Sequence, residues 1–196
     1  MFMQDFLIYF HLGWQHILDL AGYDHILFVL VLCCNYTLKD WKQILALVTA
    51  FTVGHSITLA LATFRLVNIN MDWVEFLIPV TIFLTGLSNL RKINSKQTNG
   101  SLWSLYLMTL FFGLIHGLGF SNYLQSLLGQ EATIFLPLLA FNIGLEIGQI
   151  AIVILVLIFS WIVSKLLDVK QRDWVFFLSS AVVGISFIMA LERIPL

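Results

Sequence analysis

Six apolar runs separated by short polar breaks predict helices that cross a membrane. They cover approximately Asp24–Tyr36, Trp41–Phe64, Trp73–Leu90, Leu102–Phe120, Ile134–Leu167 and Trp174–Leu191. A helix needs about 20 mainly apolar residues to span a bilayer. The first run is too short for this by itself. It must either recruit residues that precede Asp24 or enter the bilayer partway.

The segment Phe6–Leu20 is also apolar, but it carries His11, His16 and Asp19. It can lie at the membrane interface, dip into the bilayer as a half-helix, or cross it, and we favour the first two. We therefore expect an all-α integral membrane protein with one transmembrane domain, residues 1–196. Residues 1–22 would form an interfacial or re-entrant helix, and residues 23–196 a compact bundle of about six transmembrane helices.

Composition agrees with a membrane location, because 60% of the residues are hydrophobic and only 11% are charged. A soluble domain carries about 25% charged residues and needs them to cover its surface. The net charge of −1 gives no reason to expect binding to nucleic acid. Cys33 and Cys34 are adjacent within an apolar run. Neighbouring helical residues point in different directions, so we expect packing residues here rather than a chelate or a disulfide.

The distribution of lysine and arginine predicts the orientation. Eight basic residues lie in or beside the loops after the first, third and fifth runs: Lys39, Lys42, Arg91, Lys92, Lys96, Lys165, Lys170 and Arg172. Only Arg65 and Arg193 lie at the other ends. Basic loops stay in the cytoplasm. We therefore expect the odd-numbered loops to be cytoplasmic and the C-terminus to be outside.

Ionisable and amide side chains recur within these runs, and this orientation gathers them in the outer half of the membrane. They are Asp24, His25, His55, Glu75, His116, Asn142, Glu146, Gln149 and Glu192. An ionisable side chain at the centre of a spanning helix costs about 2.5–3.5 kcal/mol on insertion scales, so each needs a reason. Glu75 and Glu192 can reach the interface, and Asp24 can cap a helix. His55 and His116, set within apolar sequence, favour a shared site with His25.

The residue types predict a transition-metal site. Imidazole and carboxylate ligands suit Ni²⁺, Co²⁺ or Zn²⁺, and no thiolate is placed to favour Cu⁺. We expect His25, His55 and His116 as ligands, with Asp24 beside them. Relay or outer-shell roles fall to Glu146, Asn142, Gln149, Glu75 and Thr52. Asn142, Glu146 and Gln149 share one helix face, and Thr52 precedes His55 by one turn.

Five stretches resemble the HupE/UreJ family of bacterial membrane proteins, in its branch without a long periplasmic domain. They are HILDLAGYDHILF from His16, TAFTVGHSITLALA from Thr49, WVEFLIPVTIF from Trp73, FFGLIHGLGFS from Phe111 and AFNIGLEIGQ from Ala140. The resemblance implies a nickel or cobalt permease of the inner membrane, associated with hydrogenase and urease maturation. It also implies a functional set that adds His16 to Asp24, His25, His55, His116 and Glu146.

Three functions remain open at this point. The first is a permease for a divalent metal ion, with Glu146 passing the ion inward. The second is an intramembrane zinc hydrolase acting at the outer leaflet, in which Asp24, Glu146 or Ser56 would take part in catalysis. The third is a metal-stabilised structural or partner subunit. In each case the expected partners are the lipid bilayer and a metal ion, and the protein can also form a homo-oligomer.

Overall fold

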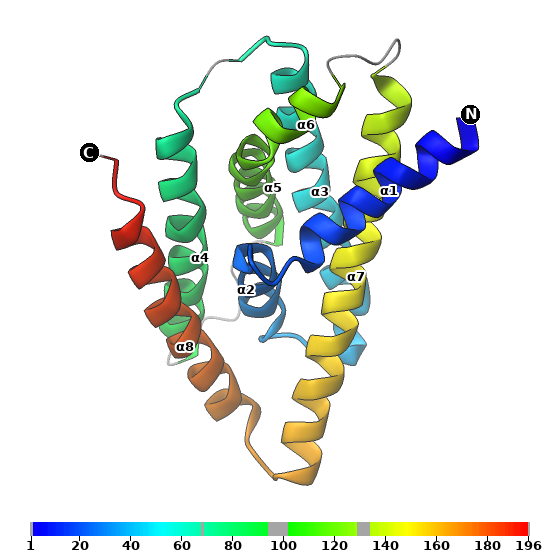
Figure 1. Ribbon diagram of the computed structural model, residues 1–196. Coiled ribbons are helices and arrows are strands. Elements are labelled where there is room, and N and C mark those ends of the chain that lie inside the picture. Colours follow the sequence, from blue (N-terminus) through cyan, green and yellow to red (C-terminus); the bar gives the residue numbers. More distant parts are fainter. Residues whose placement is uncertain (1, 68, 94–101, 129–133, 196) are drawn as a thin grey trace.

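The computed structural model describes residues 2–67, 69–93, 102–128 and 134–195. Within these ranges every regular element is helical, which confirms the expected all-α class (Figure 1). The helices are α1 (Phe2–Leu18), α2 (Asp24–Cys33), α3 (Trp41–Thr63), α4 (Met71–Ile93), α5 (Leu102–Gly119), α6 (Ser121–Leu128), α7 (Phe135–Leu166) and α8 (Gln171–Glu192). A short 3-10 helix, Leu38–Asp40, precedes α3.

The predicted spans correspond to α2, α3, α4, α5, α7 and α8. Four helical segments in the described ranges are long and apolar enough to cross a membrane: Leu38–Thr63, Met71–Ile93, Phe135–Leu166 and Gln171–Glu192. The helix α2 is shorter, as its short apolar run indicates. The amphipathic helix α6 lies between the fourth and fifth runs, where the sequence predicts no element.

The helices α1 and α2 run in the same direction as α7, with a break between them. Gly13 of α1 lies against the carbonyl of Phe141, and Gly144 of α7 lies against the carbonyl of Phe10, so a Cβ at either glycine would collide with backbone. Further along both helices, Gly148 of α7 lies against Ile17 of α1. The contacts therefore advance together from Phe10 and Gly144 to Ile17 and Gly148, and α1 and α7 run parallel. Figure 1 shows α2 below the end of α1, separated from it by a turn.

Contacts with α8 fix the direction of α2. The Gln171 side chain at the start of α8 donates a hydrogen bond to the Cys34 carbonyl just after α2, 3.0 Å away. At the opposite ends, Arg193 lies 3.8 Å from the carboxylate of Asp24. Thus α2 is antiparallel to α8, and α8 returns from α7 through a short connection. The chain therefore travels the same way through α1 and then α2, with a break near the centre of the bundle.

A second close helix pair joins α3 and α5. Gly54 lies against the Leu110 carbonyl, Gly113 against that of Phe51, and Gly117 against that of His55. Small residues let helix backbones approach closely within a membrane. This spacing holds His55 on α3 beside the turn of α5 that carries His116.

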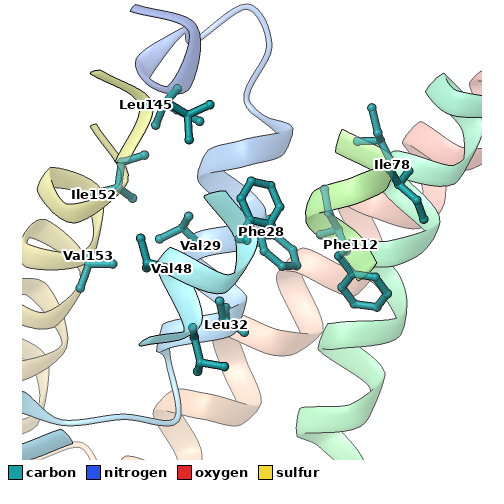
Figure 2. Packing of buried hydrophobic residues seen from close by; sticks show 14 of the residues in the cluster. Phe28, Val29, Leu32, Val48, Ile78, Phe112, Leu145, Ile152 and Val153 are labelled. Atoms are coloured by element: carbon teal, nitrogen blue, oxygen red, sulfur yellow. The ribbon is translucent and has the colours of Figure 1, made fainter. Parts of the chain in front are cut away.

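The central helix α2 forms the middle of the hydrophobic core. Its Phe28, Val29 and Leu32 are buried among side chains from α3, α4, α5 and α7 (Figure 2). On the other side of the bundle α4 packs against α8, where Gly86 faces Val183. The helices are therefore held by contacts around α2, whose first residues carry Asp24 and His25.

Candidate metal centre

The break between α1 and α2 gathers three of the predicted site residues. His16 lies in the last turn of α1, while Asp24 and His25 begin α2. Between them the Asp19 carboxylate accepts a hydrogen bond from the backbone N–H of Ala21 at 2.9 Å, which favours a turn at this position. Interrupted helices of this kind place helix ends, with their polar groups, inside membrane transporters.

Three histidines from different helices form a compact group. His16, His25 and His55 each offer one ring nitrogen, and these nitrogens all lie within 4.8 Å of one another. The ring centroids of His16 and His25 are 4.7 Å apart, and that of His55 is 5.9 Å from His16 and 6.2 Å from His25. The three rings therefore enclose a space in which one ion could contact all of them.

Each of the three rings has at least one buried nitrogen that lacks a hydrogen-bond partner within the described part of the chain. These nitrogens are Nε2 of His16, Nε2 of His25 and both ring nitrogens of His55. His55 is 0% exposed and His25 is 5% exposed. A buried polar group without a partner costs about 1–3 kcal/mol. A cation bound between the rings would satisfy these nitrogens, so the residues present fit a metal ion.

Asp24 orients His25 within the group. Its Oδ1 lies 3.1 Å from Nδ1 of His25 and also accepts the backbone N–H of His25 at 2.9 Å. Its Oδ2 faces Arg193. A carboxylate on one imidazole nitrogen leaves the other with a lone pair for a metal, a common arrangement around metal-binding histidines. In this arrangement Asp24 contacts the site through His25.

His116 lies next to the group without entering its closest set. Its ring centroid is 5.2 Å from that of His25, and its Nε2 lies 3.2 Å from the Thr81 hydroxyl of α4. Its Nδ1 is buried with no partner in the described residues. Depth and residue type predicted a group of His25, His55 and His116, and the family resemblance added His16. In the structure His16 takes the third place, and His116 connects the group to α4.

A family model for HupE / UreJ proteins matches residues 1–193. The chain belongs to the HupE/UreJ family. This membership confirms the resemblance, and together with the apolar helices it indicates a membrane protein of the nickel/cobalt transporter type. No curated protein and no solved structure matches the chain.

The Glu146 carboxylate and the Gln149 carboxamide of α7 accept hydrogen bonds from α3 in this HupE/UreJ protein. Thr49 donates a hydrogen bond to Glu146 Oε1 at 2.7 Å, and Thr52 donates to Gln149 Oε1 at 3.0 Å. These bonds join α7 to α3 within two turns of His55. Ser56, on the next turn, donates to the Thr52 carbonyl at 2.6 Å. Two hydroxyl groups of α3 thus hold the polar face of α7.

The remaining predicted residues lie apart from these contacts. Asn142 donates a hydrogen bond to the Leu138 carbonyl of its own helix at 2.8 Å. Glu75 on α4 and Glu192 at the end of α8 are exposed, which agrees with their reading as interface residues. Cys33 and Cys34 are buried free thiols at the opposite end of α2 from His25.

Aromatic rings that sequence reasoning did not single out enclose the histidines. Phe120 lies 4.0 Å from His16 between ring centroids, and Phe51 lies 5.1 Å from His116. Phe141 is 5.9 Å from His16. These rings belong to the same stretches that carry the family resemblance, but an aromatic residue in an apolar run gives no signal of its own. Their effect is to keep water away from the imidazoles.

An open pocket of about 720 Å³ leads to His16. Its wall includes Gln15 and Asp19 from the end of α1, together with Phe120 and Tyr123 near α6. His16 therefore differs from the fully buried His55, because one side of it faces this opening.

The unpartnered nitrogens of His55 predict how its removal affects stability without metal. We expect His55→Leu to leave the free energy of unfolding unchanged or to raise it by up to about 2 kcal/mol, since two unsatisfied buried nitrogens disappear. The measurement is thermal or denaturant unfolding in detergent with a chelator present. Gln149→Leu serves as the control and should destabilise, because it removes a hydrogen bond that is made. A clear loss of stability in His55→Leu would show that His55 has a structural role.

Proposed function

We propose that this protein is a permease for a divalent transition metal ion, of the Ni²⁺ or Co²⁺ type. The observation that carries the proposal is the group of three histidines that offer ring nitrogens within 4.8 Å of one another, each ring having a buried nitrogen without a partner in the described chain. Neutral imidazoles suit these ions. The ion is the cargo in this proposal, so the site must both bind it and release it.

The surroundings of the histidines support transient binding. Three neutral imidazoles carry no charge to match that of a divalent ion, and the nearby Asp24 is shared with Arg193. A site that neutralised the ion fully would hold it more tightly. The pocket beside His16 supports an entry route, because it connects the surface to one member of the group. We therefore propose that the ion meets His16 first and then His25 and His55.

A hydrolase is less well supported by the contacts of its candidate residues. Asp24 contacts His25 and Arg193 with its two oxygens, and Ser56 donates to a backbone carbonyl. Glu146 is bound to Thr49 by one oxygen only, but it does not belong to the group of histidine nitrogens. A general base for water activation must have a free oxygen within reach of the metal-bound water. The feature that favours a hydrolase is the opening near His16, whose partly apolar wall resembles what a lipid substrate would need.

We propose that Glu146 balances the charge of the ion while the ion passes the histidines and moves inward. It is a half-buried carboxylate on α7, and a single hydroxyl group holds it. A carboxylate in such surroundings needs a proton, a cation or a hydrogen-bond donor to compensate its charge. Movement of a cation nearby would supply that compensation.

This role predicts that Glu146→Gln separates transport from binding. The amide keeps the shape and can still accept the Thr49 hydrogen bond, but it carries no charge. We expect uptake of Ni²⁺ or Co²⁺ into proteoliposomes to fall about tenfold or more, equivalent to a barrier higher by ~1.4 kcal/mol. Binding to the detergent-solubilised protein should change little.

The control is Glu75→Gln, which alters an exposed carboxylate of α4 and should transport normally. Normal uptake by Glu146→Gln would contradict the role of Glu146. A wild-type protein that binds the ion but transports none would contradict the permease and favour a hydrolase. A wild-type protein that neither binds nor transports the ion would leave a structural or partner role.

We also propose that the lysine-rich end of the bundle faces the cytoplasm. The described basic residues at this end include Lys39, Arg91, Lys92 and Lys170, whereas Lys96 lies outside the described residues. The C-terminal end of α8 and the start of α1 lie toward the opposite end (Figure 1). Basic loops are retained in the cytoplasm.

The orientation predicts which engineered cysteines an impermeant thiol reagent reaches in intact cells. Lys170→Cys should resist labelling until the membrane is opened, and Asp72→Cys at the other end should label at once. Both native side chains are exposed, which makes them a matched pair. The wild-type protein reports any background from Cys33 and Cys34. The reverse pattern would overturn the orientation.

A further inference from the structure

A permease needs a route from the buried histidines to the lysine-rich end, and α4 carries a row of buried polar side chains that leads there. Thr81, Thr85 and Asn89 are spaced by four residues, so they share one face of the helix. All three are at most 5% exposed. Asn89 lies one turn before the end of α4, close to Arg91 and Lys92 in sequence. The row therefore extends from the middle of α4 almost to its end.

The Thr81 end of this row contacts the histidines. The Thr81 hydroxyl lies 3.2 Å from Nε2 of His116, whose ring is 5.2 Å from that of His25. Nδ1 of His116 is buried and has no partner in the described residues. His116 thus offers an additional nitrogen donor between the group of three histidines and α4.

The Asn89 end of the row lies close to the thiol of Cys34 and the hydroxyl group of Ser179. Asn89 donates a hydrogen bond to the Val31 carbonyl at 2.7 Å and lies 3.4 Å from the Cys34 sulfur. The same sulfur is 3.7 Å from the hydroxyl of Ser179 on α8. Cys34 and Ser179 are 0% exposed. Oxygen, nitrogen and sulfur atoms of three helices therefore gather at this point.

The other polar face near the histidines does not continue in the same way. Between α3 and α7 the hydrogen-bonded pairs end at Thr49 and Glu146. Closer to the lysine-rich end, α3 presents the buried Ile44, Leu47 and Val48. The corresponding part of α7 presents Ile152, Val153 and Leu157. These six buried side chains offer no ligand to a cation leaving along that interface.

We propose that the ion leaves the histidine group along the buried face of α4, passing from His116 to Thr81, Thr85, Asn89 and the Cys34 sulfur. This inference rests on the proposed function. Four helical residues advance about 6 Å, so each step places another donor within reach of the last. The threonine hydroxyls donate to carbonyls of their own helix, Thr81 to Ile78 and Thr85 to Thr81. Their oxygens therefore direct lone pairs outward for a cation.

Thr85 gives the sharpest test, because Thr85→Val removes the hydroxyl with little change in shape. We expect uptake into proteoliposomes to fall by about tenfold, with binding of Ni²⁺ or Co²⁺ retained at the histidines. Thr85→Ser, which keeps the hydroxyl, should transport as the wild type does. Asn89→Leu should also transport poorly while it still binds the ion.

The matched control is Thr63→Val. Thr63 is likewise a buried threonine that donates to a carbonyl of its own helix, at 2.7 Å, but it lies at the far end of α3. Normal transport in Thr63→Val and loss in Thr85→Val would support the route. Normal transport in Thr85→Val and Asn89→Leu, or equal loss in Thr85→Ser and Thr85→Val, would overturn it. A wild-type protein without uptake would instead contradict the proposed function.

Discussion

The structure depends on the cost of burying imidazole nitrogens that have no hydrogen-bond partner. Four ring nitrogens of His16, His25 and His55 are buried in this state within the described chain. The surrounding phenylalanine rings remove the water that would otherwise satisfy them. A bundle selected only for stability would place apolar side chains here. A cation that binds between these nitrogens would satisfy them, and the proposed permease function rests on this need for a cation.

Close backbone contacts keep the nitrogens together. Gly13 and Gly144 join α1 to α7, and Gly54 and Gly113 join α3 to α5. The helix α2 lies between these pairs, and its first turn brings His25 toward His16 and His55. A larger side chain at any of these glycines would separate backbones and increase the distances between rings. The geometry of the site is therefore determined by helix packing, and the loops contribute mainly the break at Asp19–Tyr23.

The sequence predicted the helices well because membrane spans have a strong signal in hydropathy. The run Trp41–Phe64, for example, became α3 with almost the same bounds. Depth and residue type also pointed to His25 and His55. The family resemblance added His16, but neither signal showed that His16 rather than His116 completes the closest group, because this depends on how α1 packs against α7. The pairs Thr49–Glu146 and Thr52–Gln149 were equally hidden, since they depend on the crossing of two distant helices.

The most direct test is the coordination shell of the bound ion, measured by X-ray absorption spectroscopy of the purified protein loaded with one equivalent of Ni²⁺ or Co²⁺. We predict nitrogen ligands with the outer-shell scattering of imidazole, and weaker imidazole scattering in His55→Leu, which keeps only His16 and His25. The Cys34 sulfur is expected only further along the route and should not appear at one equivalent. A shell of oxygen alone, or one dominated by sulfur, would contradict the assignment of His16, His25 and His55 as the binding site.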